Sequence, residues 1–338
     1  VLLTRAGYSL QPNGISVRPA DALRKKYFEA VIAEWEAFQA NGYHDFYPGG
    51  YLELFKGFSG GVLNSKESLF EVAFIDNKNK GIWGTCNGPF VESPSVLPTE
   101  SGKFMGRANA MFRVVPEWKD FFEEGDVRRD VMVCTYKYMW DKETYNHKLE
   151  EQSNRKNWYP GKWRREWMPI GYVDPNNTGV NYCMFRYADV LLMAAEAYNE
   201  LGETGKAWTL LNSVRHRAGA TEITADNYSQ LLKAPKVYDL DFIDDSDEAG
   251  RFRTALYWER GFELAFEGQR KYDLIRWGIL KEALVLFGER THSQVNSSKT
   301  VGYPAGKNFQ KGKHELLPIP EDELQVNYML DNKNNPGY

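Results

Sequence analysis

The chain has 338 residues, 42% hydrophobic and 26% charged, so it can build a packed core and is not an intrinsically disordered protein. Its formal net charge is −4, and Lys and Arg are scattered along it, which argues against binding to a nucleic-acid backbone. No run of about 18 apolar residues occurs, so we expect no membrane-spanning helix.

The first ten residues, "VLLTRAGYSL", resemble the interior of an apolar helix and contain no initiator Met, basic segment or cleavage site. We therefore expect the chain to lack upstream sequence, with room there for a targeting segment. Cys86, Cys134 and Cys183 are far apart and form no Cys-x-x-Cys pair, which fits neither a disulfide framework nor a zinc site. We expect three buried thiols, no metal and no cofactor.

Residues 1–75 are predicted to be largely helical. The opening helix should break at "QPNG", and a second helix should begin at Pro19, a residue suited to the first helical turn. Gly42 is a plausible end for that helix. The stretch "SLFEVAFI", residues 68–75, alternates well enough for a short strand. The side chains expected on one side of it are those of Phe70, Val72 and Phe74.

Residues 76–184 are rich in Gly, Pro, Asn, Ser and aromatic residues, and we expect a loop-rich region there. A short helix is predicted near "PEWKDFFEEG". The stretch "VMVCTYKYMW", residues 131–140, should form a strand, and "GKWRREWMPIGYV" should form another extended segment.

Residues 185–287 begin with a helix pair that follows the tetratricopeptide pattern, with Gly202 ending the first helix. The matching positions are Leu191, Ala194, Ala195, Tyr198, Ala207 and Leu211. One pair cannot bury both of its faces, so it must pack against other helices. The candidates are the helix at 19–41, the opening helix and the stretch 251–287. An ordinary helical hairpin in an α+β domain is the alternative.

The stretch 251–287 is predicted to be helical, with interruptions near Gly268 and Gly278. Residues 239–250, "DLDFIDDSDEAG", break the pattern of a calcium loop and are interpreted as a solvated acidic connector. Residues 288–338 should form a C-terminal loop segment with a short helix that begins at Pro320.

Three stretches occur in order: the helix pair after "NNTGVNYCMFRYADV", then "LYWERGFELAFEGQRKYDLIRWG", then "HELLPIPEDELQVN" followed by "NNPGY". Together they resemble the SusD/RagB family, surface lipoproteins of Bacteroidetes that bind glycans. The resemblance implies a mainly α fold with tetratricopeptide-like helix pairs and a loop-rich region with a few short strands. It implies one domain over residues 1–338, without the family's N-terminal portion.

The resemblance also implies a function. The protein would bind an oligosaccharide at the outer surface of the outer membrane and deliver it to a SusC-like TonB-dependent transporter. It would touch the membrane only through a lipid anchor that this chain lacks, and it would catalyse no reaction. Two alternatives remain open: a glycoside hydrolase, or a tetratricopeptide-type interaction scaffold in which the aromatic residues are core.

Glu259, Glu263 and Glu267 recur at four-residue steps, so they should share a helix face and repel one another unless cations face them. The nearby cations are Arg260, Arg270 and Arg276. Carboxylates of glycoside hydrolases usually project from different elements into a cleft. We therefore interpret the three as a structural, salt-bridged motif and expect no catalytic residues.

The segment 136–172 combines many aromatic residues with many charges and few aliphatic ones, so several rings should lie at the surface, where they suit the apolar face of a pyranose. Trp163 and Trp167 are expected to pack inward. The predicted ligand contacts in this segment are Trp140, Tyr145, Trp158 and Tyr159. A second predicted group, in the loop 77–90, consists of Trp83, Asn87 and Phe90.

Overall fold

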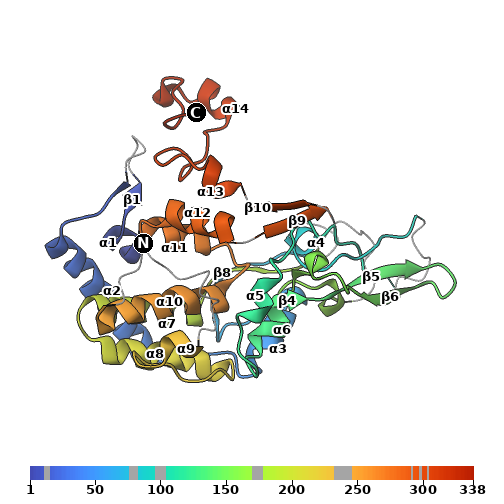
Figure 1. Cartoon of the computed structure of the whole chain (residues 1–338), viewed down its shortest axis with the longest axis horizontal. Helices are drawn as coiled ribbons and strands as arrows, with labels where there is room; N and C mark the ends of the chain where they lie inside the picture. The colour runs from blue at the N-terminus through green and yellow to red at the C-terminus, as the bar shows by residue number, and fades with distance from the viewer. Residues whose placement is uncertain are drawn as a thin grey trace.

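The computed structural model describes residues 1–10, 16–75, 83–95, 104–169, 178–231, 246–290, 292–296, 299–302 and 304–338. It is mainly helical with a few short two-stranded ribbons, which confirms the predicted fold class. A helical body, a β-ribbon that extends from one side and a C-terminal segment that projects from another are visible in Figure 1.

The predicted helix pair forms the centre of the helical body, as α7 (Tyr187–Glu200) and α8 (Thr204–Arg217). All six pattern positions are at most 6% exposed, and Gly202 ends the first helix in the left-handed region, with φ 84°. Helix α2 (Asp21–Asn41) packs along α7, and α10 (Glu248–Leu264) packs against both helices of the pair. These two neighbours cover the faces that a lone pair would expose, as predicted.

Helix boundaries follow local sequence signals. Helix α2 ends at Gly42, whose φ of 66° is left-handed, and α10 begins after Asp247, whose carboxylate accepts a hydrogen bond from the Gly250 amide at 2.6 Å. Left-handed residues Gly268 and Gly278 separate α10, α11 (Arg270–Arg276) and α12 (Leu280–Arg290), as predicted. The opening helix α1 (Leu2–Ala6) packs chiefly on α2 and also contacts α11.

Among the described residues, the strands form two-stranded antiparallel ribbons. The ribbons are β1 (Ser9–Leu10) with β2 (Ser16–Val17), β3 (Ser68–Val72) with β8 (Tyr182–Arg186), β4 (Val133–Cys134) with β7 (Tyr159–Pro160), β5 (Tyr136–Asp141) with β6 (Asn146–Glu151), and β9 (His292–Asn296) with β10 (Lys299–Gly302). The other helices are short: α3 (Gly50–Ser59), α4 (Trp83–Cys86), α5 (Glu117–Asp120), α6 (Arg128–Met132), α9 (Tyr228–Leu231), α13 (Ala305–Asn308) and α14 (Glu321–Val326).

Two predicted extended segments differ from the structure. The stretch 131–140 begins as the end of α6 and becomes extended only at Val133, because the carboxylate of Asp126 holds the Arg128 amide at 2.9 Å and starts a helical turn. Residues 161–169 form a loop with one 3₁₀ turn (Arg165–Trp167), and the rest of that predicted segment and most of the acidic connector lie outside the described residues. In β3, Phe70 and Val72 share one side, as predicted, and that side is exposed to solvent.

Candidate functional site

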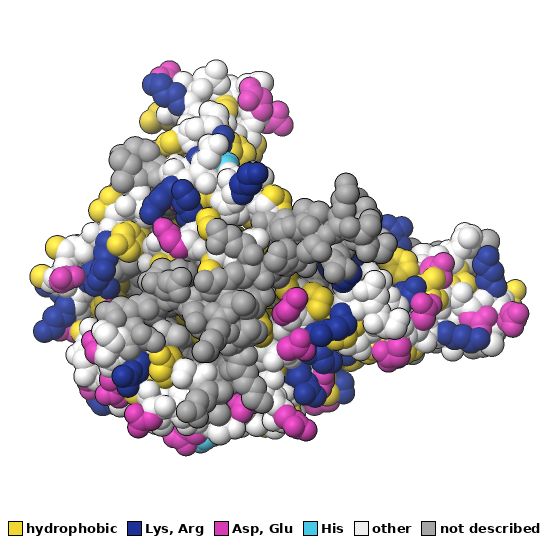
Figure 2. Space-filling model, in the orientation of Figure 1, with side chains coloured by type: hydrophobic (Ala, Val, Ile, Leu, Met, Phe, Trp, Pro, Cys, Tyr) yellow, Lys and Arg dark blue, Asp and Glu magenta, His cyan; other side chains and the backbone are white. Residues whose placement is uncertain are grey.

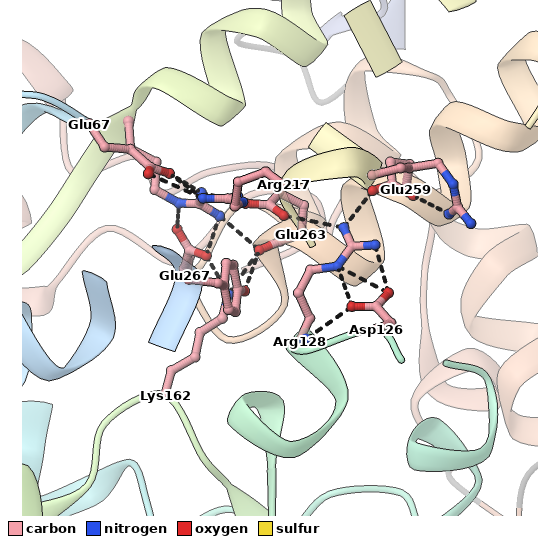
Figure 3. A network of polar contacts seen from close by, with 11 residues as sticks. Glu67, Asp126, Arg128, Lys162, Arg217, Glu259, Glu263 and Glu267 are labelled. Atoms are coloured by element: carbon pink, nitrogen blue, oxygen red, sulfur yellow. Dashed lines mark hydrogen bonds and ion pairs between the residues drawn. The ribbon is translucent and has the colours of Figure 1, made fainter. Parts of the chain in front are cut away.

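A buried network of ion pairs joins the helical body to the loop-rich half of the chain (Figure 3). Glu259 and Glu263 project from α10, and Glu267 follows its end. Their partners come from distant elements: α6, the loop after β7, β8 and α8. The cations are Arg128, Lys162, Arg186, Arg215 and Arg217, and further carboxylates in contact with them are Glu67, Glu123 and Asp126.

The expectation that cations face these carboxylates is confirmed, but the cations predicted from the sequence are wrong. Arg260 pairs with Asp189 at 2.9 Å and with Asp273 at 2.7 Å, and Arg276 pairs with Asp273 at 2.8 Å. Arg270 lies over the Tyr257 ring, 3.9 Å from its centroid. The neighbouring arginines on the same stretch therefore form a separate set of contacts, because their side chains leave the helices in other directions than the three glutamates.

Glu263 is the centre of the network and is completely buried. Its carboxylate lies 2.5 Å from Arg186 and 3.2 Å from Arg128 and also contacts Arg217. Burial by itself would raise the pKa of Glu263, but these guanidinium groups outweigh it and hold the pKa well below its usual range. The carboxylate stays ionised and out of reach of a substrate, so it cannot serve as the general acid of a hydrolase.

The network also includes Lys162, in the loop that follows β7. The Lys162 ammonium donates to the Glu263 carbonyl at 2.9 Å and contacts the Glu267 carboxylate. Burial lowers the pKa of Lys162 to about 8 despite these partners. Because Lys162 comes two residues after β7, this contact ties the loop-rich half directly to α10.

We call β5, β6 and the adjoining residues 90–92 the arm (Figure 1). Residues 90–92 run beside β5: the Tyr138 amide donates to the Phe90 carbonyl at 2.9 Å, and the Glu92 amide donates to the Tyr138 carbonyl at 3.0 Å. The Glu92 carboxylate accepts a hydrogen bond from the Trp140 amide at 2.8 Å. These hydrogen bonds attach residues 90–92 to the edge of β5, so the two-stranded ribbon has a third segment beside it.

The two faces of the arm differ in chemistry because side chains alternate along a strand. Tyr136, Tyr138 and Trp140 lie on one face, and all three are half-buried. The rings of Tyr136 and Tyr138 meet edge to face with centroids 5.7 Å apart. The opposite face carries ion pairs such as Lys137–Glu150 at 3.1 Å, and charged side chains of both signs are visible on the arm in Figure 2.

Tyr145 stands at the tip of the arm with 64% of its surface exposed. The tip loop is held by Asp141, whose carboxylate accepts hydrogen bonds from the Glu143 amide at 2.9 Å and the Thr144 hydroxyl at 2.8 Å. The backbone of Tyr145 is left-handed, with φ 50°, a conformation that costs a non-glycine residue energy. The loop therefore presents an aromatic side chain at a position that favours glycine.

Polar groups gather at the root of the aromatic face. The Tyr136 hydroxyl donates to Glu166 Oε1 at 2.5 Å and accepts from Arg164 at 2.8 Å, while Glu166 Oε2 is buried without a hydrogen-bond partner among the described residues. Burial raises the pKa of Glu166, and burial together with the charge of Glu166 raises the pKa of Tyr138 to about 12. The root of the aromatic face is thus held by a buried contact between a phenol, a carboxylate and a guanidinium.

The residues predicted as ligand contacts do not form one surface. Phe90, Trp140 and Tyr145 belong to the arm. Trp158 lies at the arm's base, with the Lys119 ammonium 5.5 Å and the Arg155 guanidinium 5.0 Å from its ring centroid, so cations occupy positions over its ring. Trp83 packs against Trp163 and Tyr182 inside the loop-rich half, with centroids 5.8 Å and 4.7 Å away.

Two predicted contacts are inaccessible. Tyr159 is 3% exposed and lies beneath the Arg113 guanidinium, because β7 pairs with β4 and turns the ring inward. Asn87 is buried, and its amide donates to the Trp83 carbonyl at 3.2 Å. Trp163 packs inward as predicted, whereas Trp167 is half-buried. The structure adds Tyr138 to the candidate residues; strand alternation in "YKYMW" would have placed it beside Trp140.

Within the described ranges, no helix is both long and apolar enough to cross a membrane. The same residues contain no group of three or more His, Cys, Asp or Glu side chains arranged to hold a metal ion. All three cysteines are described and are free thiols; Cys134 and Cys183 are buried as predicted, and Cys86 is half-buried.

Comparisons with known proteins show which family and which relatives the chain is similar to. A family model described as the SusD family matches residues 66–338. Two SusD-like proteins of Formosa agariphila, P25 and P2, are 37% and 34% identical over 164 residues, which are 48% of this chain and 26% of each relative. The matched region is thus about a quarter of the length of these curated relatives.

Solved structures share the fold. A SusD homolog from Bacteroides thetaiotaomicron superposes with a TM-score of 0.70 at 24% identity, covering 100% of this chain and 62% of that protein. Surface glycan-binding protein A from the same organism, solved in complex with laminarihexaose, superposes with a TM-score of 0.54 at 19% identity, covering 93% of this chain and 59% of that protein.

Proposed function

The chain belongs to the SusD family, and from this membership we propose that it binds an oligosaccharide at the bacterial outer surface and delivers it to a SusC-like TonB-dependent transporter, without catalysis. The match of the family model over residues 66–338 carries the proposal. A relative of the same fold, solved with laminarihexaose, supports a glucan-type or similar oligosaccharide as ligand.

The arm is the surface that we assign to the ligand. Tyr138 and Trp140 offer half-buried rings on one face, and Tyr145 offers an exposed ring at the tip. Aromatic side chains with fixed backbones bind a sugar's apolar face at low entropic cost. Glu166 and Arg164 hold the Tyr136 hydroxyl and so fix the root of that face.

The buried network argues against the hydrolase alternative. Glu259 and Glu263 are inaccessible, and Glu263 is held ionised, so neither can transfer a proton to a glycosidic oxygen. The scaffold alternative requires Trp83, Trp140 and Trp158 to be core. The half-burial of all three, with Trp83 packed on Trp163, keeps that alternative as the second candidate.

Titration with a panel of oligosaccharides that includes laminarihexaose tests the proposal. Trp140→Ala and Tyr145→Ala should each weaken binding of the best ligand about tenfold, since buried aromatic contacts are often worth more than 1 kcal/mol. Tyr328→Ala is the matched control, because Tyr328 is 87% exposed and lies in the C-terminal segment, away from the arm. Unchanged affinity in both arm variants would contradict the arm as the site.

Catalysis and delivery need separate measurements. Incubation of the bound glycan with pure protein should release no reducing ends above the buffer rate, and release would favour the hydrolase. For delivery, the exposed side of α8 is the proposed contact with the transporter. A SusC-like transporter from the same genome should co-purify with the full-length protein, and its absence would leave only the binding part of the proposal standing.

A further inference from the structure

A cleft of about 340 Å³ lies on the helical body, where the N-terminal segment, α2, α7, α10, the end of α11 and the residues just after α11 meet. Its volume falls within the range of about 300–1,000 Å³ that is typical of small-molecule sites. No residue of the arm lines it, so it is separate from the proposed glycan surface. The lining side chains that matter here are Tyr8, Arg24, Glu196, Glu200, Arg253 and Trp277.

Glu196 brings an unused hydrogen-bond acceptor to this cleft. The residue is 7% exposed, and its Oε1 accepts hydrogen bonds from Arg276 and from the Trp277 indole, the latter at 3.0 Å. The other oxygen, Oε2, is buried and has no partner among the described residues. A buried carboxylate oxygen without a donor is costly, so a ligand that donates an O–H or N–H there gains that energy.

Four arginines line the cleft, Arg18, Arg24, Arg253 and Arg276, and each lies beside a carboxylate. Arg24 lies 3.3 Å from Asp21 and 3.5 Å from Glu200, and Arg253 lies 2.5 Å from Glu200. An anionic ligand would face the free Glu196 oxygen, which needs a hydrogen-bond donor. A cationic ligand would meet several guanidinium groups. The donor that fits is a neutral hydroxyl.

The remaining lining is aromatic and apolar. Tyr8 and Trp277 are half-buried, and Tyr257 also lines the cleft. The position of Tyr8 is set by its backbone amide, which donates to the Arg276 carbonyl at 2.7 Å, and by Gly278, where a Cβ atom would lie 2.6 Å from the ring. The cleft thus combines fixed rings, a carboxylate acceptor and arginine donors.

From this combination we propose a second carbohydrate site in the cleft, which takes a neutral hexose unit with one hydroxyl donated to Glu196 Oε2. A water molecule could satisfy the same oxygen, since buried waters commonly serve such atoms. The aromatic rings distinguish the two occupants, because a sugar packs against them and a water molecule gains nothing from them.

Saturation-transfer NMR and calorimetry with glucose, galactose and mannose test the site on the whole chain. At least one hexose should bind to the unmodified protein, and Glu196→Gln should weaken that binding tenfold or more, because it replaces the free acceptor with an amide. Tyr8→Ala should weaken it several-fold without touching an ion pair. Glu203→Gln is the control, since Glu203 lies between α7 and α8 on the surface and pairs only with Lys206 among the described residues.

The outcomes separate this site from the arm. Loss of hexose binding in Glu196→Gln and Tyr8→Ala, with both variants showing cooperative thermal unfolding, supports the cleft. If Glu196→Gln does not fold, Tyr8→Ala decides alone. Hexose binding that survives both substitutions lies elsewhere and overturns the inference, as does the absence of any hexose binding, which would assign Glu196 Oε2 to water. Neither result bears on the oligosaccharide test of Trp140→Ala.

Discussion

The buried network makes a strong prediction about stability, which Glu263→Gln tests. The substitution keeps the size and shape of the side chain and removes one negative charge at a completely buried position. Three guanidinium groups, those of Arg128, Arg186 and Arg217, lose a carboxylate partner. We expect the protein to fold and to unfold at a lower denaturant concentration.

The size of the effect depends on which carboxylate partners each arginine retains after the substitution. Breaking a buried ion pair costs about 3–5 kcal/mol, because the remaining charge is left uncompensated. Here Arg128 retains Asp126 at 2.8 Å, Arg186 retains Glu67 at 2.9 Å, and Arg217 also retains Glu67, at 3.0 Å. The free energy of unfolding should therefore fall by an amount near the lower end of that range, about 3 kcal/mol.

Urea denaturation followed by circular dichroism measures the change, with Glu203→Gln as the matched surface control. The control should change the free energy of unfolding by less than about 1 kcal/mol, as is usual for an exposed ion pair. If Glu263→Gln changes the free energy of unfolding no more than the control does, the charge of Glu263 does not stabilise the protein and the reasoning is wrong. A double variant with Arg217→Met should cost less than the sum of the single changes, because the partners are coupled.

The same prediction has a pH dependence. The pKa of Glu263 is lowered from 4.5 in the folded protein, so below pH 4.5 the unfolded chain takes up a proton that the folded chain does not. The stability that Glu263 contributes is present above pH 4.5 and declines as the pH falls toward the folded pKa. The unmodified protein should therefore lose stability in acid more steeply than Glu263→Gln does.

Three further predictions concern single positions. Gly278→Ala should destabilise the protein by about 1–3 kcal/mol in thermal unfolding, because φ is 76° and the new Cβ would lie 2.6 Å from the Tyr8 ring; Gly205→Ala, in α8 with open space around it, should be neutral or stabilising. Tyr145→Gly should raise stability by about 1 kcal/mol by relieving a left-handed φ while weakening glycan binding, and a loss of stability would refute this. Burial raises the pKa of Cys134 to about 11, so iodoacetamide at pH 8 should modify it only after unfolding, as mass spectrometry of the folded and denatured protein would show.

Local signals in the sequence were sufficient for the helical body. The small and large positions of the helix pair, and left-handed glycines such as Gly202 and Gly278, depend on residues close in the chain, and they were predicted correctly. The partners of Glu259 and Glu263 were not. Arg128 lies 131 residues from Glu259 in the sequence, and nothing in its surroundings indicates that contact. Ion pairs between segments that are distant in the sequence form only when the chain folds, so local sequence patterns do not reveal them.

The candidate site was predicted in part for a related reason. Composition located the aromatic segment, but it could not tell which rings pair across strands and which are covered. Tyr159 is buried because β7 pairs with β4, and the Trp158 ring has cations over it that come from two different segments. Strand alternation around Trp140 was a usable signal, since it places every second side chain of β5 on one face.

The network and the arm together suggest how affinity is distributed along the arm. Tyr136 is held by Arg164 and Glu166, and the same loop is tied to α10 through Lys162, so the root of the aromatic face is fixed before a ligand arrives. Fixed rings lose little freedom on binding, whereas the exposed Tyr145 must be ordered by the ligand. Substitutions at the root should therefore cost more affinity than substitutions at the tip, and substitutions that loosen Lys162 should weaken binding without touching the ligand.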